Sequence, residues 1–233
     1  MNRRYIPALT LIATLTVAGS FLHASPQKAQ KLKPTAAATP AAAPAVAIIS
    51  VSGVNDIDSS RAYGSKNAPV VMEIFSDFQR PACKALNSSV NQKLMDEYVS
   101  TGKVYLVHRD FPLPMHAYSR VAASYARAAA HVGKGEPVEQ ALFQNQEIWE
   151  ANGDVKGTVA AVLSPAEMKK VQALVDAKTL EPLIEKDKQI GQTLPVTQTP
   201  TSVFHSKGQN YPYAGTLSYD VLKDFLDQLV AQK

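Results

Sequence analysis

An apolar run that leads into a proline-started helix constrains this chain more than any other feature of its sequence. Residues 70–75 (VVMEIF) are almost continuously apolar, which is typical of a strand buried on both faces of a sheet. Pro81 follows closely, and its fixed φ suits the first position of a helix. A second β-branched run at 104–108 completes a strand, a helix and a strand, which predicts two parallel strands joined by a right-handed crossover.

The crossover helix is predicted to run from Pro81 to about Ser100 and to end at Gly102. Its expected buried stripe recurs every four residues and consists of Leu86, Val90, Leu94 and Tyr98. Cys83 falls in the first turn of this helix and is the single cysteine of the 233 residues. No disulfide can therefore form within the chain.

A block of helices is predicted after the turn at 109–114, whose prolines a helix cannot cross. The expected helices span residues 117–132, 137–149, 165–177 and 179–192. The third has the most specific start signal, because Ser164 and Glu167 form a capping box around a proline at the first helical position.

A hairpin and a last helix are predicted near the end of the sequence. Strands at 201–206 and 211–214 flank a turn at 207–210, and Ser218 caps a helix. The inward face of that helix is expected to consist of Leu222, Phe225, Leu226 and Leu229. With a short strand at 46–51 and a loop at 55–67, the predicted order is β, β, α, β, a block of helices, β, β, α. This order is that of an α/β fold.

The first 24 residues have the layout of a secretory signal peptide, because two arginines precede an apolar stretch at 6–22. The alternative is an uncleaved membrane anchor, although the stretch is shorter than the about 20 residues of a comfortable span. Residues 25–47 are mostly Ala, Pro, Lys, Gln and Thr, which predicts a flexible linker. We therefore expect an exported, periplasmic or otherwise extracytoplasmic protein whose folded domain spans 48–233 and which contacts a membrane only through its N-terminal segment.

The net charge of +4 is concentrated before residue 48, where five basic residues and no acidic residue occur. Of the 24 basic residues, 19 are left against 20 acidic residues in the rest of the chain, a net charge of −1. A folded domain without a cationic surplus lacks the electrostatic footprint of a DNA- or RNA-binding protein. The histidines lack metal-ligand spacing and no phosphate-binding loop occurs, so neither a metal nor a cofactor is expected.

Several spaced motifs resemble those of the DsbA-like thioredoxin-fold proteins of bacterial envelopes. The motifs are residues 64–70 (GSKNAPV), 75–78 (FSDF), Cys83-Lys84, 108–113 (HRDFPL) and 199–201 (TPT). The resemblance covers roughly residues 60–231. It implies a thioredoxin fold, βαβ followed by ββα, with a helical domain inserted between the two halves at about 115–194.

The resemblance also implies where substrates bind. Thr199 would precede a cis-proline, Pro200, facing the helix that begins at Pro81 and Ala82, and substrate polypeptides would lie along exposed backbone there. The family site has two cysteines that flank two residues, and the first is the exposed nucleophile.

The chain departs from the family at that nucleophile, because Arg80 stands three residues before Cys83. Arginine has no sulfur, so dithiol oxidase or isomerase activity does not carry over. Cys83 is then either a packed thiol left from a lost site or a monothiol able to form mixed disulfides with glutathione or substrate. Arg80 is either solvated or binds an anion beside Pro200. Asp77 either caps the helix or modulates protonation of Cys83.

Three hypotheses follow. The first is an exported DsbA-like protein without dithiol catalysis, which binds extended or unfolded polypeptides of the cell envelope beside Pro200. The second is an enzyme that uses Cys83, either a monothiol oxidoreductase or a glutathione-dependent relative of the kappa-class transferases, which resemble this fold but have serine at the place of Arg80. The third is a variant or drifted copy of an active oxidoreductase.

Overall fold

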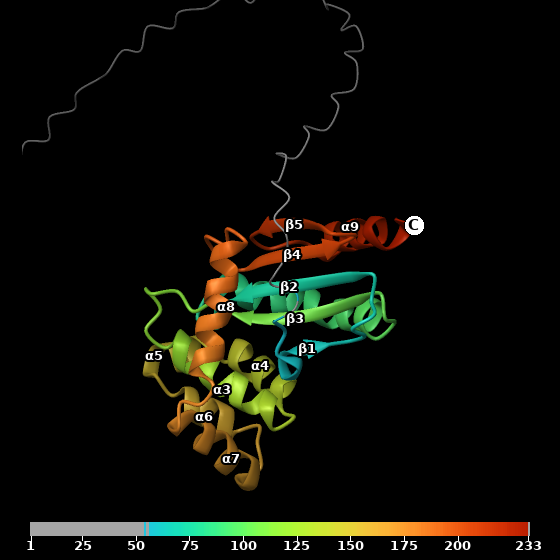
Figure 1. Cartoon of the computed structure of the whole chain (residues 1–233). Helices are drawn as coiled ribbons and strands as arrows, with labels where there is room; N and C mark the ends of the chain where they lie inside the picture. The colour runs from blue at the N-terminus through green and yellow to red at the C-terminus, as the bar shows by residue number, and fades with distance from the viewer. Residues whose placement is uncertain (1–53, 55, 233) are drawn as a thin grey trace, which may run out of the picture. The chain divides into compact units, whose positions relative to one another are not determined.

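One mixed sheet organises the computed structural model, which describes residue 54 and residues 56–232 (Figure 1). The strands lie in the order β1-β3-β2-β4-β5, and β2 and β3 are parallel whereas the other neighbours are antiparallel. Their bounds are β1 (Ala62–Tyr63), β2 (Val70–Ser76), β3 (Val104–Asp110), β4 (Thr201–Ser206) and β5 (Gln209–Ala214). The predicted parallel pair at the centre of an α/β fold is confirmed. The predicted signal peptide, the linker and the strand at 46–51 lie outside the described residues.

The expected loop at 55–67 was wrong in part, because it contains an edge strand. Asp58 accepts a hydrogen bond from the N–H of Ser60 and begins the short 3₁₀ helix η2 (Ser59–Arg61). The two-residue strand β1 follows and pairs with β3, with Ala62 opposite Val107. A strand of two residues is too short to show the alternation by which strands are recognised in a sequence.

The crossover helix runs without interruption from residue 81 to 99, although its winding changes along its length. It consists of α1 (Pro81–Leu86), the π-helical segment η3 (Asn87–Asn91), α2 (Gln92–Leu94) and the π-helical segment η4 (Met95–Val99). The predicted stripe is confirmed, because all four of its side chains are buried. An apolar residue every fourth position exceeds the about 3.6 residues of an α-helical turn, and the wider π turns keep that stripe on one face.

Both faces of the sheet are covered. Met72 and Ile74 of β2 point to the face that packs against the crossover helix and α9 (Tyr219–Ala231). Phe75, one position further along, points to the opposite face and packs with Ile190 of α8 (Glu181–Thr193). Burial on both faces accounts for the continuous apolar composition of this strand.

The helical block lies between β3 and β4 in the chain and at one end of the sheet in space (Figure 1). Besides α8 it consists of α3 (Ser119–His131), α4 (Gly135–Gln144), α5 (Gln146–Asn152), α6 (Val155–Ala160) and α7 (Pro165–Asp176). The capping box predicted at Ser164 and Glu167 is present. The single helix expected over 137–149 was wrong: two helices meet at Asn145, whose side chain donates to the carbonyl of Ala141 at 2.9 Å.

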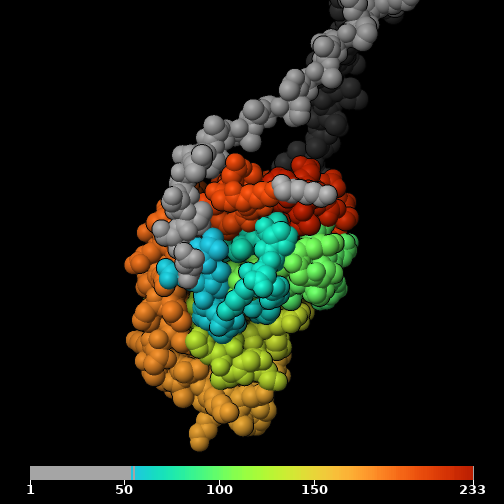
Figure 2. Space-filling model, turned by 45° about the vertical axis from the view of Figure 1, so that its right-hand side comes forward, coloured from blue at the N-terminus to red at the C-terminus, as the bar shows by residue number. Residues whose placement is uncertain are grey.

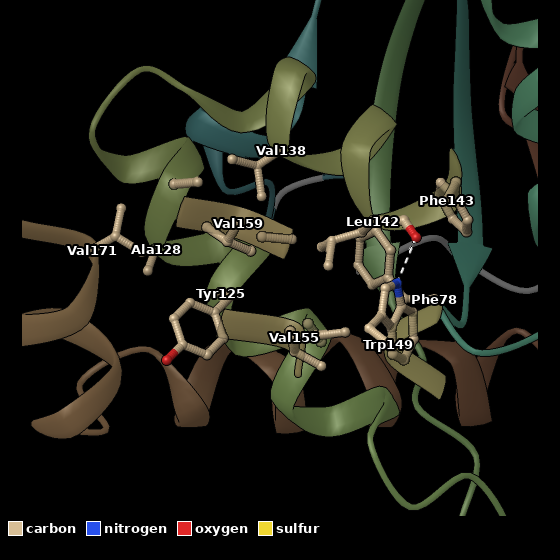
Figure 3. Close-up of a cluster of buried hydrophobic side chains, with 14 of the residues drawn as sticks. Phe78, Tyr125, Ala128, Val138, Leu142, Phe143, Trp149, Val155, Val159 and Val171 are labelled. Carbon is tan, nitrogen blue, oxygen red and sulfur yellow. Dashed lines mark hydrogen bonds between the residues drawn. The ribbon is translucent and has the colours of Figure 1, made fainter. Parts of the chain in front are cut away.

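The core of the block includes a residue that comes from the sheet side of the chain (Figure 3). Phe78, which follows β2, packs its ring 4.8 Å from that of Phe143, measured between centroids. Trp149 is buried beside them and donates its indole N–H to the carbonyl of Leu142 at 2.7 Å. The segment after β2 is therefore anchored in the helical block as well as in the sheet.

The hairpin of β4 and β5 is tighter than predicted. Its turn has two residues, Lys207 and Gly208, with φ of 49° and 73°, rather than four. Positive φ at both positions matches the right-handed twist of a hairpin. Ser218 caps α9 as predicted, and three of the four predicted inward residues are buried, while Phe225 is partly buried.

The space-filling view shows the C-terminal hairpin and α9 at one end of the described domain and the helical block at the other (Figure 2). Strands β1, β2 and β3 lie between them, and α8 runs along one side of the sheet (Figure 1). Among the described residues, no helix combines the length and the apolar character needed to cross a bilayer.

Candidate functional site

Cys83 lies in the first turn of α1, at the end of the central strand. Arg80 is the N-cap residue of this helix, with an extended backbone, and Pro81 is its first residue. The N–H of Cys83 donates to the carbonyl of Arg80 at 2.9 Å, so the segment 80–83 is fixed as a helical turn. Only 2% of the Cys83 surface is exposed, while Pro81 is exposed and Ala82 half-buried.

The Cys83 thiol is held in its neutral form. Burial raises the pKa of this thiol, and this effect outweighs the hydrogen bonds that would lower it. The N–H of Asp77 donates such a bond and is 3.5 Å from Sγ. The side chains of Ser76 and Thr199 also act to lower the pKa, although Oγ1 of Thr199 forms no hydrogen bond of ordinary geometry. Because the thiolate is the nucleophilic form, Cys83 is a weak nucleophile at neutral pH.

The buried carboxylate of Asp77 fixes the segment ahead of the helix. Its Oδ1 accepts from the N–H of Gln79 at 2.8 Å and from the hydroxyl of Ser119 at 2.5 Å. Its Oδ2 accepts from the N–H of Leu113 at 2.7 Å and lies 2.8 Å from Nδ1 of His116. With four partners, Asp77 joins the segment before α1 to the loop that follows β3. It also disfavours the Cys83 thiolate electrostatically.

Gln79 connects the same segment to both neighbours. Its side-chain oxygen accepts from the N–H of Tyr118 at 2.8 Å, and its amide nitrogen donates to Glu150 at 3.3 Å. The carbonyl of the adjacent Phe78 accepts from Gln146 of α5 at 2.6 Å. The loop after β3 therefore flanks one side of the segment and α5 flanks the other.

Arg80 is the exception among the arginines of the described residues. Its side chain is half-buried, its Nε is buried without a hydrogen-bond partner, and it forms no ion pair with any described carboxylate. The other four arginines each bind at least two carboxylates: Arg61, Arg109, Arg120 and Arg127.

The peptide bond between Thr199 and Pro200 is cis. Both residues are buried, and the carbonyl of Pro200 accepts from the N–H of Gly215 at 2.8 Å. Within the described part of the chain, neither the N–H nor the C=O of Thr199 forms a backbone hydrogen bond. Its side chain acts on the Cys83 thiol, so the residues before the cis bond and the start of α1 belong to one site.

Two large apolar side chains are exposed on the segments that flank this site. Met115, 75% exposed, lies in the loop that binds Asp77, and Ile148, 61% exposed, lies on α5. No other large hydrophobic side chain of the described residues has a higher exposed fraction than these two. Met115 adds apolar surface to the loop beside the segment before α1, whereas Ile148 lies on the face of α5 opposite Gln146 and Glu150, which contact that segment.

A cavity of about 30 Å³ lies behind Cys83, between β2, β3 and the crossover helix. Its lining is almost wholly apolar, but His108 and Arg61 also face it. Nδ1 of His108 lies 2.6 Å from Oε2 of Glu139, and its Nε2 has no partner, as is also true of Nε of Arg61. Burial, with Arg61 adding to the effect, lowers the pKa of His108 to about 3.

A buried network of ion pairs joins the sheet to the helical block. Arg127 of α3 binds Asp58, Asp110 and Asp187, so one guanidinium bridges η2, β3 and α8. The other pairs of the network are Arg61 with Asp110 and Glu139, and Arg109 with Glu73 and Asp187. Burial raises the pKa of Asp187, whereas the positive charge of Arg127 acts to lower it. Sequence reasoning missed this network, because its members are scattered through six elements.

The structure brings together the residues that the sequence singled out around the cysteine. Arg80, Pro81, Ala82 and Cys83 form the start of α1, and Thr199 acts on the thiol from the turn before β4. The histidines do not join them at one centre: in the described residues no group of three or more His, Cys, Asp or Glu side chains could hold a metal ion. Gln79 and Met115 were missed, and no local pattern distinguishes either of them.

Comparisons with known proteins show the family to which this fold belongs. A thioredoxin family model matches residues 56–228. Disulfide bond formation protein D of Bacillus subtilis is 25% identical over 189 residues, which cover 76% of this chain and 80% of that protein.

Two solved structures are similar in fold. Alpha-DsbA1 of Wolbachia pipientis superposes with a TM-score of 0.62 at 17% identity, over 74% of this chain and 91% of that one. Oxidised BdbD of Bacillus subtilis gives 0.61 at 20% identity, over 73% and 92%. The chain has DsbA-like relatives among the thiol-disulfide oxidoreductases, and it belongs to the thioredoxin family.

Proposed function

We propose that this chain is an extracytoplasmic, DsbA-like protein that lacks dithiol catalysis and binds extended polypeptide beside Pro200. One observation carries the proposal: the single cysteine is buried with a raised pKa, and the position three residues before it is Arg80. The fold and the thiol-disulfide ancestry come from the family, and the loss of catalysis comes from this chain's own residues.

Dithiol catalysis needs two sulfurs that alternate between thiol and disulfide. An exposed thiolate attacks the substrate disulfide, and a second thiol resolves the mixed disulfide. Cys83 can supply the second sulfur, whereas Arg80 cannot supply the first. A related monothiol enzyme would have to attack through Cys83 itself, and burial of this thiol weighs against that.

Binding of an extended polypeptide is supported by backbone and side chains together. The backbone N–H and C=O of Thr199 form no hydrogen bond within the described residues, which leaves them free to pair with a strand-like peptide. Only 1% of Thr199 is exposed, so this pairing requires that neighbouring side chains move aside. Exposed Met115 supplies apolar surface on the loop that binds Asp77. Such a combination gives affinity through main-chain hydrogen bonds and selectivity through side-chain contacts.

The extracytoplasmic location rests on residues 1–24, whose pattern is that of a secretory signal peptide. Residues 25–47 would then separate the domain from the membrane during or after export. Disulfide chemistry belongs to oxidising compartments of this kind, and DsbA-like relatives fit such a setting.

A reduction assay with three proteins tests the proposal. The unaltered protein, Cys83→Ala and Arg80→Cys are each incubated with insulin, and dithiothreitol supplies the electrons. We expect the unaltered protein and Cys83→Ala to match the background rate and Arg80→Cys to exceed it. Turnover by the unaltered protein that Cys83→Ala abolishes would overturn the proposal and favour a monothiol enzyme.

Calorimetric titration with an unfolded, cysteine-free polypeptide tests whether the protein binds polypeptide. We expect the unaltered protein and Cys83→Ala to bind it equally, because no covalent step is involved. Absence of binding in both would refute the polypeptide-binding function, whatever the redox result.

A further inference from the structure

The unpaired charge of Arg80 marks a second feature of the proposed binding site. Each of the other arginines in the described residues satisfies its guanidinium with carboxylates, whether it is buried or at the surface. The side chain of Arg80 is half-buried, and its Nε is buried without a hydrogen-bond acceptor. A guanidinium that is partly desolvated and unpaired is an available site for an acidic partner.

The neighbouring charged groups have other contacts. All four hydrogen-bonding positions of Asp77 are occupied, so its carboxylate is committed to the segment before α1. Lys84 pairs with Glu147 at 3.1 Å, and Glu150 accepts from Gln79. Glu150 forms no ion pair within the described residues, so it is the acid on α5 whose charge an acidic ligand would have to tolerate.

Apolar surface is exposed on the loop that is fastened beside this cation. The loop that carries Met115 is fastened to Asp77, and α5, which carries Ile148, is fastened to Phe78 and Gln79. Arg80 follows Gln79 directly and is the residue from which α1 starts. The loop with exposed Met115 is therefore fastened beside the residue that precedes this cation, whereas Ile148 lies on the face of α5 opposite Gln146 and Glu150.

From this arrangement we infer that Arg80 binds the carboxylate of an Asp or Glu side chain in an extended peptide whose adjoining apolar residue packs on Met115. This inference rests on the polypeptide binding proposed above and names the class of segment that the site selects. Arginine suits this role because its planar fork can hold both oxygens of a carboxylate.

The expected strength of the contact is modest, because the side chain is partly solvated. A half-exposed ion pair changes affinity by about fivefold, and salt weakens it. Selectivity for acidic segments should accordingly fall as ionic strength rises, whereas the apolar contribution should not.

Isothermal titration calorimetry with capped, amidated peptides tests the inference without charged labels or termini. One peptide has a Glu next to Leu, the second has Gln for that Glu, the third has Lys, and the fourth keeps Glu but has Ser for Leu. We expect the unaltered protein to bind the first about fivefold more tightly than the second. The third and the fourth should both bind more weakly than the first.

Variants assign the selectivity to one residue. Arg80→Gln should bind the Glu and Gln peptides equally, and Arg80→Lys should retain part of the preference because it keeps the charge without the fork. Arg120→Gln is the matched control, since its guanidinium is already paired with Glu181 and Glu185, and it should leave the preference unchanged. Glu150→Gln should increase the preference, because a competing charge is removed.

The outcomes separate this inference from the proposed function. If all peptides bind with equal affinity, or if Arg80→Gln keeps the preference for Glu, the inference is wrong while polypeptide binding stands. If no peptide binds, polypeptide binding itself fails. If a neutral peptide with a free C-terminal carboxylate binds better than the capped Glu peptide, the site selects chain ends, and the inference for acidic side chains is wrong.

Discussion

Arg127 and Arg80 show two opposite ways in which this protein places a guanidinium. Arg127 is buried where α3 meets the sheet and is bound by three carboxylates from separate elements. Arg80 is half-buried at the start of α1 and has no carboxylate among the described residues. The first has its partners within the fold, and the second leaves its charge for a group from outside.

This difference separates the residues that set the architecture from those that meet a ligand. Burying a charge costs several kcal/mol unless it is paired, so a buried guanidinium fixes the positions of its carboxylates. The network around Arg127 thereby holds the helical block against the sheet. A half-solvated arginine carries little of that penalty and contributes little to stability.

The largest effect is expected from Arg127→Leu. Removing this guanidinium leaves Asp110 and Asp187 with fewer partners in a buried environment, so the free energy of unfolding should fall by about 3–5 kcal/mol. Urea denaturation monitored by circular dichroism measures the change. Lys223→Ala, which removes an exposed pair with Asp227, is the control and should lower the free energy of unfolding far less than Arg127→Leu does. Equal losses of unfolding free energy in the two variants would contradict the contrast between buried and exposed ion pairs.

His108 gives the network a dependence on pH. Its folded-state pKa of about 3 lies below the unfolded value of 6.5, so the unfolded chain takes up the proton first. The contribution of the neutral imidazole to stability is present above pH 6.5 and is lost as the pH falls toward 3. Between pH 6.5 and 3, the free energy of unfolding that His108 contributes should fall by at most about 1.4 kcal/mol per pH unit.

The free energies of unfolding of the unaltered protein and of His108→Gln are compared at pH 7, 5 and 4. This comparison isolates the effect, because the variant lacks the titrating group. Nitrogen-detected NMR should show an imidazole that stays neutral down to pH 5. Titration of His108 with a midpoint near its ordinary value would contradict the account.

A smaller pH effect is expected at the capping box of α7. Hydrogen bonds from the backbone and hydroxyl of Ser164, with help from Lys134, lower the pKa of Glu167 to about 2. A depressed acid pKa contributes stability that is present above the ordinary value of 4.5 and is lost as the pH falls toward 2. An NMR titration of Glu167 should place its midpoint near 2, and Ser164→Ala should return it toward 4.5. A midpoint that the Ser164 variant does not move would argue against the cap.

The smallest effect on stability is expected from Arg80→Gln. Because Arg80 forms no ion pair in the described structure, its replacement should change the free energy of unfolding by less than about 0.5 kcal/mol. The same denaturation experiment measures it beside Arg127→Leu. A loss of several kcal/mol would show that Arg80 is part of the architecture and would weaken the case for a ligand.

The fold was predictable from the sequence to the extent that it follows from periodicity and caps. The continuous run of β2, the four-residue stripe of the crossover helix and the capping box at Ser164 each identify an element from local residues. The strand β1 and the split at Asn145 were missed. Tertiary pairing and a side-chain bond to the backbone decide them, and neither has a sequence pattern.

The candidate site was likewise predictable from the sequence only in part. The start of α1 and its cysteine were predictable, because proline and a lone thiol are visible in the sequence. The thiol's burial, the four partners of Asp77 and the unpaired state of Arg80 depend on residues from distant parts of the chain. The network of Arg127 was missed because charged residues at helix and strand positions are ordinarily expected at the surface.

The insulin reduction rate of Arg80→Cys, compared with that of the unaltered protein, tests the central claim most directly. The account predicts that the unaltered protein stays at the background rate and that this one substitution produces turnover, which a further Cys83→Ala abolishes. Turnover by the unaltered protein would contradict the claim that dithiol chemistry is absent. An inactive Arg80→Cys that is folded, by circular dichroism, would contradict the claim that only the attacking sulfur is missing.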